Sequence, residues 1–136
     1  MTLVFATTNR HKFIEADKIL TGLPITLVSL DEQDDIRAPE ETGLTFADNA
    51  KLKATYYSSN NNFLTVADDS GLEIDALDRE PGVHSARFNG ESYHKKFEEI
   101  YRQLRERNVT NSPARFVCSV ALAEQKNVIF ETTRTI

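Results

Sequence analysis

The loop Thr7 to Lys12, with the sequence T-T-N-R-H-K, has the residue types and the position of a phosphate-binding loop. It lies between a short apolar run and a helical pattern. A helix N-terminus offers unpaired backbone N–H groups and the positive end of the helix dipole, so a loop that enters a helix can bind phosphate. Lys12 in the first turn would add a mobile charge, and Thr7 and Asn9 further donors. The alternative is that Thr8 or Asn9 caps the helix and that Lys12 is solvated.

Two acidic segments are candidates for metal chemistry. Glu40-Glu41 precedes Thr42-Gly43, and Asp68-Asp69-Ser70-Gly71 follows an apolar run at a predicted strand end. Adjacent carboxylates repel each other, and a hard cation such as Mg²⁺ between a carboxylate and a substrate phosphate lowers that cost. If the strands before Thr7 and before Asp68 are parallel neighbours, both segments lie at the carboxyl edge of the sheet, where ligands gather. A solvated acidic loop and an acidic turn are the alternatives.

Two further segments carry cations. Lys51 and Lys53 lie in a predicted helix, and Arg87 ends the segment Pro81-Gly82-Val83-His84-Ser85-Ala86-Arg87. Lysines can neutralise a triphosphate, and a guanidinium can bind phosphate through two hydrogen bonds. Each of the three is otherwise an ordinary surface charge.

Composition limits the class of protein that carries these segments. The 136 residues are 40% apolar and 27% charged, which is typical of one compact domain. The net charge of -5 gives no basic field for a nucleic-acid polymer. The single cysteine, Cys118, excludes an internal disulfide and fits a reducing compartment. The N-terminal residues have neither a basic region nor a long apolar run, so we expect no membrane association and a cytoplasmic location.

The elements expected to position these residues alternate between strands and helices. The patterns predict strands at residues 3–6, 25–30 and 63–67, a half-exposed strand at 72–76, and strands at 116–123 and 127–133. Helices are predicted from the polar loop to Gly22, from Thr45 to about Ser58, and over residues 94–106, where Phe97, Ile100 and Leu104 share a face. An acidic loop at residues 31–41 precedes the second helix, which Thr45 can cap while Asp48 reaches back to it.

In this order the segments resemble those of the inosine triphosphate pyrophosphatase family, also called the Ham1 or RdgB-like non-canonical purine nucleoside triphosphatases. The resemblance covers the whole chain. It rests on the sequences T-x-N-x-x-K from Thr7, E-E-T-G-L-T-F from Glu40 with N-A and K-A after it, A-D-D-S-G-L from Ala67, P-G with S-A-R from Pro81, and A-R-F-x-C from Ala114.

The resemblance implies an α/β fold with a mixed, elongated sheet flanked by helices, and a homodimer. It implies Mg²⁺-dependent hydrolysis of ITP, dITP and XTP to the monophosphate and pyrophosphate. By the same analogy Glu41 and Asp69 bind Mg²⁺, and Asp69 also helps to activate water. The residues that would hold the triphosphate are Thr7, Thr8, Asn9, Arg10, His11, Lys12, Lys53, Ser70 and Arg87.

The family pattern continues past the region that this sequence covers. Members go on into a Phe-Gly-Tyr-Asp and a Ser-His-Arg segment, which the resemblance assigns to the purine base and which do not occur here. We therefore expect a single domain over residues 1–136 that lacks the base-recognition segment. Two other functions stay open: a nucleotide-binding or dimerising module without turnover, and a magnesium-dependent phosphatase in which Asp68 or Asp69 is phosphorylated.

Overall fold

The computed structural model describes residues 1–30, 37–88 and 92–136 and shows a mixed five-stranded sheet in the order β2-β1-β3-β4-β5. The strands are β1 (Thr2–Phe5), β2 (Thr26–Ser29), β3 (Leu64–Ile74), β4 (Ala114–Glu124) and β5 (Asn127–Thr135). The helices are α1 (Arg10–Leu20), α2 (Phe46–Ser58) and α3 (Tyr93–Glu106), with short 3₁₀ turns η2 (Asp75–Leu77) and η3 (Gly82–His84). The predicted α/β class is confirmed. The first six residues of the predicted acidic loop, 31–36, lie outside the described residues.

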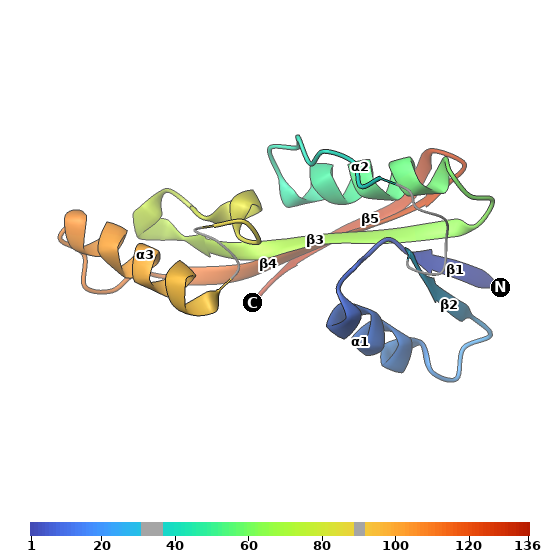
Figure 1. Cartoon of the computed structure of the whole chain (residues 1–136), viewed down its shortest axis with the longest axis horizontal. Coiled ribbons are helices and arrows are strands. Elements are labelled where there is room, and N and C mark those ends of the chain that lie inside the picture. The colour runs from blue at the N-terminus through green and yellow to red at the C-terminus, as the bar shows by residue number, and fades with distance from the viewer. Residues whose placement is uncertain (31–36, 89–91) are drawn as a thin grey trace. The chain divides into compact units, whose positions relative to one another are not determined.

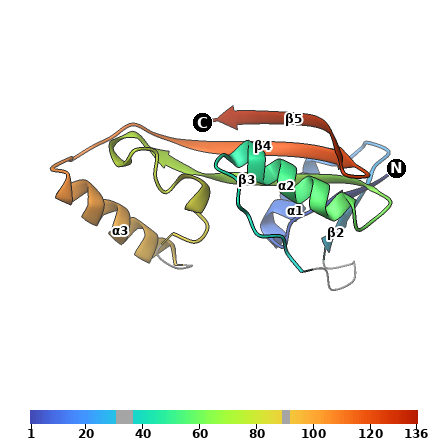
Figure 2. The ribbon, with the colours of Figure 1, turned by 90° about the horizontal axis from the view of Figure 1, so that it is seen from above.

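The strands β2, β1 and β3 form the parallel part of the sheet. β1 pairs with β2 from Thr2 opposite Thr26 to Phe5 opposite Ser29, and with β3 from Leu3 opposite Leu64 to Phe5 opposite Val66. The helices α1 and α2 lie on opposite sides of these strands (Figures 1 and 2). This arrangement puts the end of β1, the start of α1 and residues 68–69 of β3 at the same edge, as parallel neighbours require.

The acidic pair Asp68-Asp69 does not end a strand, contrary to the prediction. Residues 64–74 form one continuous strand, β3, and both carboxylates are buried within it at 8% exposure. Lysines of the two flanking helices lie close to these carboxylates and partly neutralise them, so the strand tolerates the pair. The pairing of β3 with β1 ends at Val66, just before the acidic pair, and β3 itself continues to Ile74.

The strands β4 and β5 form a hairpin, as predicted. The amide and carbonyl of Phe116 exchange hydrogen bonds with those of Ile136 at 2.8 and 2.9 Å, the pattern of an antiparallel pair. At the turn, Gln125 and Lys126 both have positive φ, 45° and 74°, as a tight two-residue hairpin connection requires.

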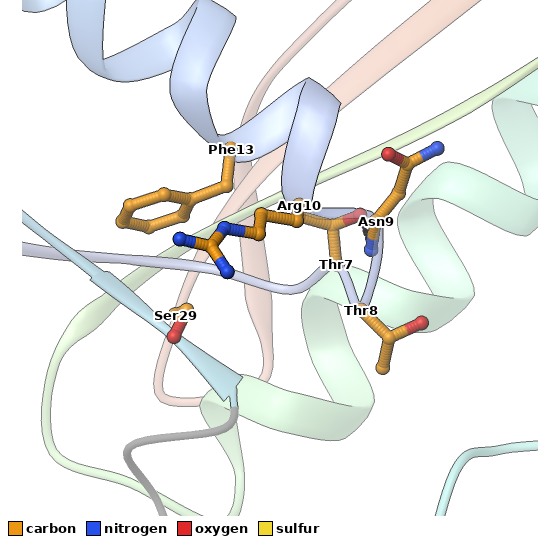
Figure 3. Close-up of a pocket in the computed structure, with 6 residues that line it drawn as sticks. All are labelled: Thr7, Thr8, Asn9, Arg10, Phe13 and Ser29. Atoms are coloured by element: carbon orange, nitrogen blue, oxygen red, sulfur yellow. Dashed lines mark hydrogen bonds between the residues drawn. The ribbon is translucent and has the colours of Figure 1, made fainter.

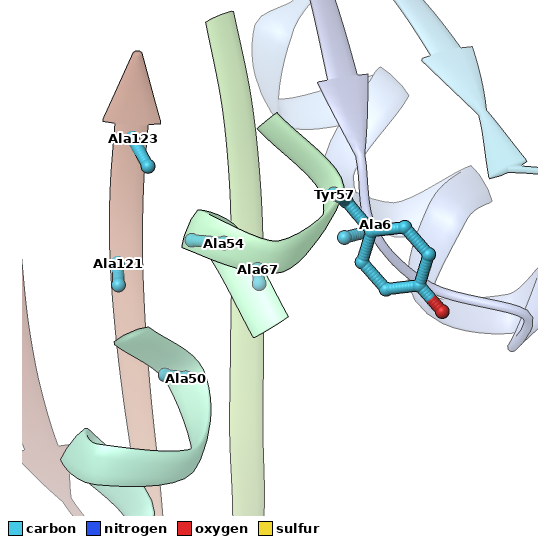
Figure 4. Packing of buried hydrophobic residues seen from close by; sticks show 7 residues of the cluster. All are labelled: Ala6, Ala50, Ala54, Tyr57, Ala67, Ala121 and Ala123. Atoms are coloured by element: carbon cyan, nitrogen blue, oxygen red, sulfur yellow. The ribbon is translucent and has the colours of Figure 1, made fainter. Parts of the chain in front are cut away.

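The chain forms two compact units. The first consists of residues 1–69 and 119–133, and the second of residues 70–118 and 134–136. In the first unit α2 packs on the sheet almost entirely through alanines (Figure 4). The cluster comprises Ala6, Ala50, Ala54, Tyr57, Ala67, Ala121 and Ala123. Because alanine side chains are short, they let the helix backbone approach the strands closely.

The second unit has its own apolar core. Ile74, Leu77 and Ile100 are buried there, and Leu104 packs against them. Phe97, which was predicted to share a helix face with Ile100 and Leu104, is 49% exposed and lies outside this core. Among the residues that the structure describes, no helix has the length and apolar character needed to cross a membrane.

Candidate active site

The loop between β1 and α1 is held by its own side chains. Asn9 is the N-cap of α1, and its Oδ1 accepts hydrogen bonds from the amides of His11 at 3.0 Å and Lys12 at 3.3 Å. The hydroxyl of Thr7 accepts from the amide of Asn9 at 3.1 Å. The capping alternative for Asn9 is therefore confirmed, and three amides at this helix start already have partners within the loop.

A first pocket of about 250 Å³ opens beside this loop. Its lining comes from the ends of β1 and β2 and the first turn of α1, and comprises Thr7, Thr8, Asn9, Arg10, Phe13 and Ser29. The Arg10 side chain extends between the ring of Phe13 and Ser29 (Figure 3). Thr8, Arg10 and His11 are exposed to solvent. The pocket thus presents a cation and three hydroxyl groups at the carboxyl ends of two parallel strands.

A second, smaller pocket of about 130 Å³ is also lined by Thr7 and Thr8 of this loop. Charged and hydroxyl groups from the β1–α1 loop, α1, the loop before α2, α2 itself and β3 converge in it. Its lining comprises Ala6, Thr7, Thr8, Lys12, Leu30, Ala38, Pro39, Glu41, Lys53, Tyr57 and Asp68. Within it the Nζ of Lys12 lies 2.5 Å from Oδ2 of Asp68. The first helical turn is thereby tied to β3 by an ion pair.

Lys53 stands between the two carboxylates predicted as metal ligands. Its Nζ lies 3.7 Å from Oε1 of Glu41 and 3.6 Å from Oδ1 of Asp69. All three side chains are sheltered, with exposures of 16% for Lys53, 28% for Glu41 and 12% for Asp69. The structure therefore gathers Glu41, Lys53 and Asp69 from a loop, a helix and a strand into one charged group.

The carboxyl group of Asp69 is poorly solvated and incompletely paired. Its Oδ2 is buried and has no hydrogen-bond partner among the described residues. Burial raises the pKa of Asp69 above its ordinary value, and this effect outweighs the lowering by Lys53 and by a hydrogen bond from Asn49. The negative charges of Glu41 and Asp68 raise that pKa further. A carboxylate in this position gains from an additional cation.

These residues fit a hard divalent cation. The buried oxygen of Asp69 that lacks a partner and the neighbouring carboxylate of Glu41 are the oxygen donors that Mg²⁺ prefers. Within residues 1–30, 37–88 and 92–136, no three His, Cys, Asp or Glu side chains converge as a ready metal cage. A site with two carboxylates suits Mg²⁺, because Mg²⁺ usually takes its remaining ligands from water and substrate phosphates.

Two predicted site residues belong to the second unit. Ser70 continues β3 after Asp69, and Arg87 is exposed in the turn after η3. The segment that carries Arg87 is anchored by Ser85, whose hydroxyl accepts from the amide of Leu72 at 2.9 Å and donates to the carbonyl of Gly82 at 2.6 Å. A side chain at Gly71 would place its Cβ 2.4 Å from the Ser85 hydroxyl, so glycine is required there.

The structure separates candidates that the sequence left equivalent. Glu40 is exposed, whereas Glu41 faces Lys53. Lys51 lies 3.3 Å from Glu131 of β5 and is not among the residues that line either pocket of the site. Of the neighbouring lysines in α2, only Lys53 lines the second pocket.

Two residues of α2 near the site had no predicted role. Asn49 is 1% exposed and lowers the pKa of Asp69, and Tyr57 lines the second pocket. Burial raises the pKa of Tyr57, with Tyr56 and Glu41 adding to the effect. Asn49 and Tyr57 lie four residues before and four residues after Lys53. This helical spacing places all three on one face of α2, and it can be read from the sequence.

Solved structures share this architecture. The chain is similar to a HAM1 protein from Coxiella burnetii, with a TM-score of 0.89 and 31% identity over 99% of this chain and 69% of that one. It is also similar to the Ham1 protein of Staphylococcus aureus, with a TM-score of 0.83 and 33% identity over 99% of this chain and 70% of that one.

Curated relatives show the same similarity in sequence. A dITP/XTP pyrophosphatase from Methylacidiphilum infernorum is 40% identical over 133 residues, which are 96% of this chain and 65% of that protein. Another from an Exiguobacterium species is 40% identical over 136 residues, 100% of this chain and 69% of that protein. The chain therefore spans about two thirds of the length of these relatives. A model of the Ham1 family matches residues 3–135, and the chain belongs to that family.

Proposed function

We propose that this protein hydrolyses non-canonical purine nucleoside triphosphates, namely dITP, XTP and ITP, to the nucleoside monophosphate and pyrophosphate. The observation that carries the proposal is the gathering of Lys12, Lys53, Glu41 and Asp69 at the carboxyl edge of the parallel strands. The names of the similar curated proteins support the choice of substrate.

The triphosphate is bound by the cations of the two pockets. Lys12 and Lys53 line the second pocket, and Arg10 lines the first. Thr7 and Thr8 line both pockets. Because Lys12 is already paired with Asp68, an incoming phosphate competes with a carboxylate for the same ammonium group. We also assign substrate contacts to Asn9, His11, Ser70 and Arg87, on the basis of the family resemblance.

Glu41 and Asp69 hold Mg²⁺ in this proposal. When bound, the ion neutralises phosphate charge and lowers the pKa of a coordinated water. Asp69 accepts the proton of the attacking water, a role that suits a carboxyl group whose pKa burial has raised. Lys53 stays next to both carboxylates and supplies positive charge beside the phosphates.

The decisive experiment is product analysis with the purified chain. Incubation with dITP or XTP in the presence of Mg²⁺ should release pyrophosphate and the nucleoside monophosphate. Release of orthophosphate would favour the phosphatase alternative, in which Asp68 or Asp69 is phosphorylated. Calorimetry with dITP and Mg²⁺ that shows binding, combined with no product, would identify a binding module.

Oligomeric state and location complete the proposal. We propose that the protein is a cytoplasmic homodimer. Each chain is a single domain that includes both compact units, and no nucleic-acid polymer is a partner. The net charge of -5 supports the absence of a nucleic-acid partner, the single cysteine supports the cytoplasmic location, and the dimer follows the family resemblance. Light scattering during size-exclusion chromatography measures the dimer directly, and a mass of one chain would contradict it.

A further inference from the structure

Asn49 lies between the loop and the strand that carry the two proposed metal ligands. Its side chain is 1% exposed and projects from α2 one turn before Lys53. Its Oδ1 accepts a hydrogen bond from the amide of Gly43 at 2.7 Å. The same side chain lowers the pKa of Asp69, and since a carboxylate only accepts, the amide NH₂ group is the end that can act on it. One side chain thus holds the Glu41 loop and influences the carboxyl group of Asp69 on β3.

The contact at Gly43 requires a close approach of the loop to α2. A Cβ at position 43 would lie 2.5 Å from Oδ1 of Asn49, 2.8 Å from Cβ of Asp48 and 2.9 Å from the amide of Asn49. No side chain fits at these distances. The loop that carries Glu41 is therefore pressed against the start of the helix at the residue that Asn49 binds.

Helix capping does not account for this contact. The N-cap of α2 is Thr45, whose hydroxyl accepts from the amide of Asp48 at 3.1 Å. Asn49 lies beyond that first hydrogen bond, and its Oδ1 accepts from Gly43 of the loop rather than from an amide of α2.

We propose that Asn49 is a positioning residue, which sets Glu41 at a fixed place relative to Asp69 so that both carboxylates bind one divalent cation. The inference rests on the proposed function for the identity of the two ligands. Partners of this kind orient a ligand through their hydrogen bonds, and their loss usually costs about 10- to 100-fold in metal affinity or activity.

The test compares two α2 variants of the full chain. Asn49→Leu keeps the approximate shape but removes the hydrogen bond to Gly43 and the amide group that lowers the pKa of Asp69. Ser58→Ala is the matched control, because Ser58 is also 1% exposed on α2 and accepts a loop amide, that of Lys126, at 3.1 Å. Both variants should lose some thermal stability. Only Asn49→Leu should weaken Mn²⁺ binding, measured by electron paramagnetic resonance, by about 10-fold or more.

Two further readouts distinguish positioning from general support of the fold. In Asn49→Leu the Gly43 amide should exchange its hydrogen faster, and kcat for dITP should fall about 10-fold or more while KM changes little. Faster exchange at Gly43 with unchanged Mn²⁺ affinity would overturn the proposal. If Asn49→Leu does not fold, Gly43→Ala disturbs the same contact from the loop side. That variant should also weaken Mn²⁺ binding, and unchanged binding would overturn the proposal.

The outcomes separate this inference from the proposed function. Wild-type protein that fails to hydrolyse dITP, but whose Mn²⁺ affinity depends on Asn49, would refute the function and support the positioning role. If the wild-type protein hydrolyses dITP and Asn49→Leu binds Mn²⁺ with the wild-type affinity, the function is supported and the positioning role is refuted. Wild-type protein that binds no Mn²⁺ would overturn the positioning role.

Discussion

The charged groups of the first unit and those of α3 in the second unit are arranged in opposite ways. On α3, Arg102 pairs with Glu99 and with Glu106, all within two turns of one exposed helix. In the first unit, Lys12 and Lys53 pair with carboxylates far away in sequence, and those carboxylates are largely buried. The ion pairs on α3 are therefore local in sequence, whereas those of the first unit depend on the fold.

The pKa values of the carboxyl groups in the two regions are shifted in opposite directions. Hydrogen bonds from Arg102 and Gln103 lower the pKa of Glu99 to about 2. Burial raises the pKa of Asp69, and one of its oxygens has no partner in the described part of the chain. Charges on α3 are thus satisfied by the protein itself, whereas those of the first unit are left able to gain from a cation or a phosphate. Perturbed carboxyl groups of this kind concentrate at functional sites.

Removal of the charge of Asp69 should give the largest effect. Asp69→Asn keeps the size of the side chain and most of its hydrogen bonds but removes the negative charge needed by a metal ligand or a base. We expect pyrophosphate release from dITP to fall by about 100-fold or more. Asp68→Asn should be milder, because Asp68 pairs with Lys12 and the adjacent carboxylate is kept. Normal turnover by Asp69→Asn with loss of activity in Asp68→Asn would reverse the assignment.

The Lys12 pair should separate binding from stability. Lys12→Met leaves Asp68 buried without its cation, so stability should fall by about 1–3 kcal/mol, and the loss of a charged phosphate contact should weaken dITP binding about tenfold or more. In the double variant Lys12→Met with Asp68→Asn, the uncompensated charge is gone. Chemical denaturation should show stability largely recovered, and calorimetry should show binding still weak. Recovery of both would assign Lys12 to the fold alone.

The pH dependence of stability should have opposite signs at Asp69 and Glu99. The folded-state pKa of Asp69 is raised, so the folded protein holds this proton longer, and stability falls as pH rises from the ordinary Asp value through the raised one. In metal-free protein Asp69→Asn should therefore be stabilised relative to wild type above that window and not below it. Melting temperatures over a pH series measure this. A constant difference at every pH would contradict the buried-charge interpretation.

Glu99→Gln is the comparison for that series. The pKa of Glu99 is lowered to about 2, so its contribution is present above the ordinary Glu value and is lost as pH falls toward about 2. Because Glu99 lies on an exposed helix, its effect on the melting temperature should be small and should decrease with salt. An effect as large as that of Asp69→Asn would remove the contrast between the two regions.

The smallest effect is expected for Arg102→Ala. Its ion pairs lie at the surface of the helix, so the variant should change the free energy of unfolding very little and leave dITP hydrolysis unchanged. Denaturation and the pyrophosphate assay check both. A loss of activity would mean that α3 contributes to the reaction.

The sequence by itself determined the local elements of this protein. An apolar run followed by a capping Asn9 specified the first strand, loop and helix, and Thr45 specified the start of α2. The polar turn at Gln125 and Lys126 specified the hairpin. These features depend on backbone preferences and hydrogen bonds over a few residues, which a sequence pattern records directly.

Only the tertiary structure decided how these elements combine into a site. The alanine-lined contact of α2 with the sheet sets how near Asn49 and Lys53 come to Asp69, and so distinguishes Lys53 from Lys51. The continuation of β3 through the acidic pair depends on lysines from two other elements. These outcomes arise from packing distances and charge pairing between residues far apart in the chain, and no local pattern contains that information.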